Sequence, residues 1–201
     1  MKTKVSTMKT KARITLFGLV MVIALCYANI ASADTDSATG AGATASVDLD
    51  FQIVIPSFIY FRVGTAVPGT VDVINFNPTG TDVATPGAIT AGTGGDAGGG
   101  AVNVDVISNG GNITITELND GGGTGLSDGG SNNISYAQII TADGGNISAP
   151  TLSDAAANTV TILSAGITVE SDVWTYTYSN PATPPVAATY TGRVTYTAAI
   201  P

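Results

Sequence analysis

The stretch Ala188–Ala198 reads A-T-Y-T-G-R-V-T-Y-T-A and alternates between two kinds of side chain. Successive side chains of a β-strand point to opposite faces of the sheet, so this alternation predicts a strand with one packed face and one solvent face. Threonines and Arg193 would occupy the solvent face. The packed face would carry Tyr190, Gly192, Val194, Tyr196 and Ala198.

A second alternating ribbon, Ser46–Ile55, lies near the other end of the chain. Polar residues stand opposite its apolar row as far as Ile53, and Pro56 ends the ribbon because proline cannot donate to a strand ladder. We expect a strand here. The apolar row consists of Val47, Leu49, Phe51, Ile53 and Ile55.

Between these ribbons, short alternating runs are separated by turn-forming Gly, Asn and Pro residues, and no stretch sustains a helical period of 3.6 residues. The pattern predicts an all-β fold, an immunoglobulin-like or Greek-key β-sandwich of about ten short antiparallel strands. Besides the two ribbons, the expected strands are Phe58–Val63, Thr70–Phe76, a short one at Gly87–Thr90, Ala101–Ser108, Ile113–Leu118, Ile134–Thr141, Asn158–Leu163, Gly166–Glu170 and Val173–Tyr178.

The first 33 residues have the three parts of a signal peptide: a basic start, the apolar run Ile14–Leu25, and a small-residue cleavage site at Ala31–Ala33. An uncleaved anchor is disfavoured because the run is shorter than the roughly 20 residues of a membrane span. A lipid anchor on Cys26 is disfavoured because the large Leu25 precedes it. We therefore expect a secreted protein with a signal peptide over residues 1–33, a flexible leader over 34–45 and one β-sandwich domain over 46–201.

Basic and acidic residues are distributed unequally on the two sides of the predicted cleavage site. Five of the seven basic residues precede residue 34, whereas all fifteen acids follow it, so the rest of the chain keeps only Arg62 and Arg193 and has a net charge of −13. Nucleic acids and anionic membranes need a basic patch, so neither is an expected partner, and no membrane span is expected after signal cleavage. Without cysteine after Cys26, no disulfide can form within the exported part of the chain.

Common catalytic machinery is missing from the sequence. The chain has no histidine, which excludes Ser-His and Cys-His nucleophile pairs and the usual zinc sites. A pair of carboxylates would still suffice for a secreted hydrolase of the glycosidase type. Chance pairs are easy among fifteen acids, and several of the acids lie beside Gly or Asn in predicted loops, so we expect a protein that is not an enzyme.

Two further candidates for binding residues stand out. Asp120 and Asp128 lie in the Gly- and Asn-rich stretch Asn119–Asn133, which offers the oxygen ligands that calcium prefers, although the same residues commonly make turns. Calcium is therefore only a possible ligand, and no other cofactor is expected. Trp174, Tyr176 and Tyr178 share one face of a predicted strand and would serve either as a glycan-stacking platform or as ordinary sheet packing.

The flexible leader, the Ser46–Ile55 ribbon and the closing Y-T-G-R-V-T-Y-T strand together resemble secreted bacterial pilin or fimbrial subunits of the chaperone–usher kind. That resemblance implies a donor strand that leaves its own subunit and completes a neighbour's sheet, with a periplasmic chaperone as a partner before assembly. Val47, Leu49, Phe51, Ile53 and Ile55 would be the donor side chains, and Tyr190, Val194 and Tyr196 would line the acceptor side. The alternative is an ordinary first strand paired within its own sandwich.

We therefore expect an extracellular, acidic structural protein, a subunit of a cell-surface filament, fimbria or matrix that assembles by β-strand addition. The alternatives are a monomeric carbohydrate- or calcium-binding adhesion module and a carboxylate-based secreted hydrolase.

Overall fold

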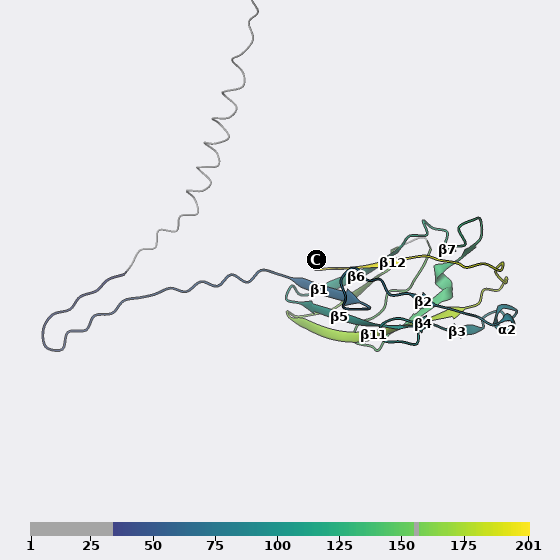
Figure 1. Ribbon diagram of the computed structural model, residues 1–201. Coiled ribbons are helices and arrows are strands. Elements are labelled where there is room, and N and C mark those ends of the chain that lie inside the picture. Colours follow the sequence, from purple (N-terminus) through teal and green to yellow (C-terminus); the bar gives the residue numbers. More distant parts are fainter. Residues whose placement is uncertain (1–33, 155–156) are drawn as a thin grey trace, which may run out of the picture. The chain divides into compact units, whose positions relative to one another are not determined.

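The structure is a computed structural model that describes residues 34–154 and 157–201 (Figure 1). The predicted signal peptide lies outside the described residues. Contacts divide the chain into two units, Met1–Val54 and Ile55–Pro201. In the first unit, the described residues 34–54 form no helix or strand and are all exposed. The second unit, which begins nine residues later than the expected domain start at Ser46, contains every strand described below.

The larger sheet is antiparallel and has the strand order β1-β5-β11-β3, with β9 also paired to β11. The long strands β5 and β11 lie at its centre, and β1 forms one edge by pairing only with β5. The bounds are β1 Ile59–Val63, β3 Ile89–Ala91, β5 Ala101–Ser108, β9 Ile139–Ala142 and β11 Thr168–Ser179.

The second sheet has three antiparallel strands in the order β10-β6-β12. It is joined to the larger sheet by the tight connection Asn109–Asn112 between β5 and β6, where Gly111 adopts a φ of 85° that favours glycine. Both β10 and β12 are edge strands. Their bounds are β6 Ile113–Asn119, β10 Thr159–Ile162 and β12 Val194–Ala199.

Short elements complete the unit. Two minimal strand pairs, β2 with β4 and β7 with β8, lie outside the two main sheets. The helical turn α2 begins with a capping box between Thr79 and Asp82. The bounds are β2 Ile74–Asn75, β4 Thr93–Gly94, β7 Leu126–Ser127, β8 Asn133–Ile134, α2 Gly80–Val83 and the 3₁₀ turn η1 Tyr136–Gln138.

One hydrophobic core receives side chains from both sheets. The larger sheet contributes alternate residues of β5 and the rings of Trp174 and Tyr176, and the second sheet contributes Ile113 and Ile115 from β6. Tyr136, Ile147 and Leu152 close the core from the connecting segments. The predicted all-β sandwich is thus confirmed.

Several predicted strands differ in extent, and only Ile74–Asn75 of the predicted Thr70–Phe76 forms a strand, β2. The predicted strands Gly166–Glu170 and Val173–Tyr178 merge into a single twelve-residue strand, β11, which begins at Thr168, because Ser171 and Asp172 continue the ladder opposite Asp105 and Val104. The final strand begins at Val194 rather than Ala188, and Thr191 instead bridges to Ser127. The predicted strand Ile134–Thr141 is interrupted by η1, whose Ser135 hydroxyl accepts a hydrogen bond from the Ala137 amide.

Among the described residues, no helix has both the length and the apolar character needed to cross a bilayer.

Candidate functional site

In the ribbon Ser46–Ile55, here called the arm, the row of apolar side chains is exposed to solvent. Phe51 is 85% exposed and Ile53 84% exposed, and the other three members of the row are exposed as well. The amides of Ser46 and Asp48 donate to carboxylates of the leader, those of Asp36 and Asp34. Within the described part of the chain, the backbone from residue 49 to residue 55 makes no hydrogen bond and belongs to no strand.

Two edge strands of the sandwich approach each other. β1 is an edge of the larger sheet, β12 is an edge of the second sheet, and their Cα atoms come within 8 Å. No other described strand pairs with the outer edge of either one. We call this pair of facing edges the seam. An unpaired edge presents free N–H and C=O groups that can bind another extended segment.

The predicted acceptor residues divide between two places. Val194 and Tyr196 lie on the inward face of β12 and pack against the core. Tyr190 precedes the strand, and its hydroxyl donates to the Val186 carbonyl oxygen at 2.8 Å. The structure therefore brings Val194 and Tyr196 to the seam and places Tyr190 elsewhere.

Tyr196 joins the seam to the core. Its ring contacts Trp174 edge-on, with centroids 5.1 Å apart, and its hydroxyl lies 3.1 Å from that of Tyr176. Burial raises the pKa of Tyr176 to about 12 and raises the pKa of Tyr196 further. These hydroxyls therefore stay neutral in ordinary conditions, and the inner face of β12 is fixed in place by packing.

The aromatic stripe of β11 lies inside the sandwich. Trp174 is fully buried, Tyr176 and Tyr178 are buried, and the indole Nε1 of Trp174 donates to the Ile147 carbonyl oxygen at 2.7 Å. No face of these rings is open to a sugar, so the structure places core packing, rather than a glycan platform, at this stripe.

Asp120 and Asp128 bind different loops. Asp120 accepts hydrogen bonds from the Arg193 amide and the Tyr136 hydroxyl, at 2.8 and 2.9 Å. Asp128 accepts from the Asn132 side chain and the Gly130 amide, both at 2.7 Å. These hydrogen bonds lower the pKa of each carboxyl, that from the Arg193 amide most for Asp120 and that from Asn132 most for Asp128. In the described residues no three acidic side chains converge into a metal-binding group.

Asp172 also holds a loop in place through hydrogen bonds to its carboxylate, and no pattern in the sequence indicated this role. Its carboxylate accepts hydrogen bonds from the backbone amides of Gly144, Asn146, Ile147 and Val173, at 2.7–2.9 Å. Burial alone would raise its pKa, but the hydrogen bonds outweigh burial and lower it. Because 28 residues separate Asp172 from Gly144, no local sequence pattern could have identified this contact.

A surface depression of about 390 Å³ is lined by residues outside β1 and β12. Its lining combines amide side chains and prolines with one aromatic ring, that of Tyr190. Such a lining can offer hydrogen bonds and one apolar surface to a neutral ligand. The residues are Ser131, Asn132, Asn133, Ile134, Ser135, Gln138, Pro181, Thr183, Pro184, Pro185, Val186 and Tyr190.

Comparison with known proteins places the chain in no family: no family model matches the sequence, and no curated protein matches it significantly.

Proposed function

We propose that this chain is an exported structural protein, the subunit of a cell-surface filament or matrix that assembles by β-strand addition. The arm of one copy adds to the outer edge of β12 in another copy. The observation that carries the proposal is the arm itself: a row of large apolar side chains, all exposed, in a segment that forms no helix or strand among the described residues.

Burial of the row supplies the driving force. Each large apolar side chain that leaves water contributes roughly 1.5–3 kcal/mol. Monomeric soluble proteins rarely leave a contiguous apolar surface of this kind uncovered. On an added strand, main-chain hydrogen bonds provide further affinity and the alternate side chains provide register.

The junction between the arm and β1 favours pairing between copies. A two-residue hairpin at Pro56-Ser57 would need a positive φ at its first turn residue, whereas proline holds φ near about −65°. The Phe58 amide, which would close such a hairpin, donates instead to the side-chain oxygen of Asn109 at 2.8 Å. These two features disfavour a two-residue hairpin between the arm and β1, which supports pairing between copies.

The test is the size of the exported protein, by unheated gel electrophoresis and electron microscopy of the same sample. The wild type should give ladders or filaments that collapse to monomer on boiling. Phe51→Asp should give monomers only, because the charge would enter the apolar groove. The matched control, Gln52→Asp, adds the same charge to the opposite face of the arm and should still assemble. Normal filaments from Phe51→Asp would reject the proposal.

One observation favours a second function, that of a carbohydrate-binding adhesion module. The depression is lined by Asn132, Asn133 and Gln138 together with Tyr190. Amides together with one aromatic ring suit a neutral sugar. Tyr190→Ala should then lose binding on a glycan array while it keeps its melting temperature. An unchanged array profile would remove this candidate.

A further inference from the structure

A rung of exposed apolar side chains crosses the outer face of the larger sheet. Tyr60 on β1, Ile107 on β5 and Val169 on β11 stand directly opposite one another in the strand register. They are 47%, 37% and 67% exposed. Apolar neighbours on adjacent strands form a continuous surface, so this rung is a patch rather than three isolated residues.

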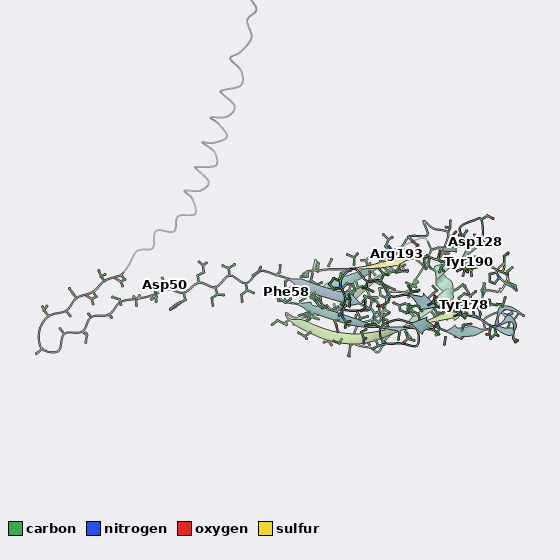
Figure 2. The ribbon with its side chains drawn as sticks, in the orientation of Figure 1. Asp50, Phe58, Asp128, Tyr178, Tyr190 and Arg193 are labelled. Carbon is green, nitrogen blue, oxygen red and sulfur yellow. The ribbon has the colours of Figure 1, made fainter. Side chains whose placement is uncertain are left out.

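The patch continues toward the end of the sandwich at which β1 begins. By the same alternation, Phe58 precedes Tyr60 and Ile167 precedes Val169, and both are exposed, Ile167 to 77%. Phe58 lies where the chain enters the sandwich (Figure 2). We call these five residues the end patch: Phe58, Tyr60, Ile107, Ile167 and Val169.

A polar rung bounds the end patch on its inner side. Arg62, Asp105 and Ser171 occupy the next positions on the same face. The Arg62 guanidinium Nε donates to Asp105 at 2.8 Å, and the Ser171 hydroxyl donates to the other oxygen of Asp105 at 2.7 Å. An apolar centre with a satisfied polar rim is the usual anatomy of a protein–protein interface.

The arm is tethered closely to this patch. Only Pro56 and Ser57 separate the last donor residue, Ile55, from Phe58. The Asn109 side chain fixes the backbone of this short connection. Its Oδ1 accepts a hydrogen bond from the Phe58 amide at 2.8 Å, and its Nδ2 donates to the Pro56 carbonyl oxygen at 3.0 Å. Three residue steps span at most about 10 Å, so any molecule that binds Ile55 must lie within that distance of Phe58.

We propose that the end patch is the second half of the subunit interface, covered by the same copy of the chain that accepts the arm. This inference rests on the proposed strand addition, which brings that copy to the patch through the two-residue tether. The sandwich of the accepting copy packs against the end patch and buries it. Strand addition then fixes both register and orientation, because the neighbour is held at the arm and at the sandwich surface together.

The experiment compares three full-length variants in the same assembly assay. The end-patch variant is the double substitution Val169→Asp and Ile167→Asp, which places charge in the end patch. The control, Leu118→Asp, adds charge to an exposed position of β6 in the other sheet. The third variant, Phe51→Asp, disables the arm. We expect the end-patch variant to raise the concentration needed for filaments by about tenfold. We expect Leu118→Asp to match the wild type, and Phe51→Asp to stay monomeric.

The outcomes separate the two claims. Wild-type assembly by the end-patch variant, with Phe51→Asp monomeric, would overturn the end patch and leave strand addition standing. Normal assembly by Phe51→Asp would overturn strand addition, and the end-patch inference with it.

A second readout does not depend on how well the charged variant folds. The chain has no cysteine after Cys26, so Val169→Cys can carry a single environment-sensitive dye. Its emission should shift to the blue on assembly, whereas a dye on Leu118→Cys should not respond. Equal emission from the end-patch dye before and after assembly would contradict the inference.

Discussion

Acidic side chains in this protein mostly hold loops in place. Asp172 ties the segment around Asn146 to β11, Asp120 ties Tyr136 to the residue before β12, and Asp105 pairs with Arg62. A carboxylate that accepts several N–H groups replaces the hydration it loses on folding. The sequence placed several acids in predicted loops, but their distant partners could not be read from local patterns.

Substitutions of Trp174 test how much one buried side chain contributes to stability. Trp174→Ala should lower the free energy of unfolding by about 3–5 kcal/mol, because it leaves a cavity against Tyr196. Trp174→Phe keeps a ring, loses the hydrogen bond to Ile147, and should lose less. Urea unfolding of both variants measures the difference. An alanine variant as stable as the wild type would show that the indole is not part of the core.

Among the elements, strands with clean alternation were predictable. β5 has the predicted bounds Ala101–Ser108, and β6 extends one residue beyond its prediction. The prediction was wrong where tertiary contacts override the pattern. Residues 188–193 alternate well, yet Thr191 forms an isolated bridge to Ser127, and β12 begins only at Val194. The arm alternates equally well and belongs to no strand among the described residues, because alternation alone does not supply the neighbouring strand with which it would have to pair.

The candidate site was only partly readable from the sequence. The row of the arm and the inward side of β12 follow directly from period-two alternation. The end patch does not, because it depends on which residues of β1, β5 and β11 stand opposite one another. The buried stripe of Trp174, Tyr176 and Tyr178 shows the same limit, since alternation identifies a shared face and not whether that face is covered.

Substitutions of Asn109 test the hydrogen bonds that hold the segment leading into β1. Asn109→Asp keeps an acceptor for the Phe58 amide but places a negative oxygen against the Pro56 carbonyl. Asn109→Ala removes both hydrogen bonds. We expect each variant to lower the free energy of unfolding by about 1 kcal/mol and to speed hydrogen exchange at the Phe58 amide. Wild-type exchange at Phe58 in Asn109→Ala would show that the side chain does not fix the junction.

For the whole molecule, the lowered carboxyl pKa values predict a loss of stability in acid. Hydrogen bonds lower the folded-state pKa of Asp172, Asp120, Asp105 and Asp128. A lowered pKa contributes stability that is full above the unfolded value of about 3.9 and is lost as the pH falls through the folded value. The urea midpoint should therefore be steady from about pH 7 to 5 and fall below about pH 4.

Asp172→Asn is the matched variant for this pH series. It should be less stable than the wild type at neutral pH and should lose less on acidification, because one of the titrating groups is gone. Parallel curves for the two proteins, or a wild-type midpoint that is constant down to pH 2, would contradict the assignment of acid sensitivity to these hydrogen-bonded carboxylates.

Strand addition at β12 can be measured directly by backbone hydrogen exchange in assembled protein and in the monomeric Phe51→Asp variant. The prediction is slow exchange across Val194–Ala199 in the assembly alone, with the other edge of the same sheet, β10, exchanging equally in both samples. Equal exchange of β12 in the two samples, or protection that arises at β10 instead, would contradict the account.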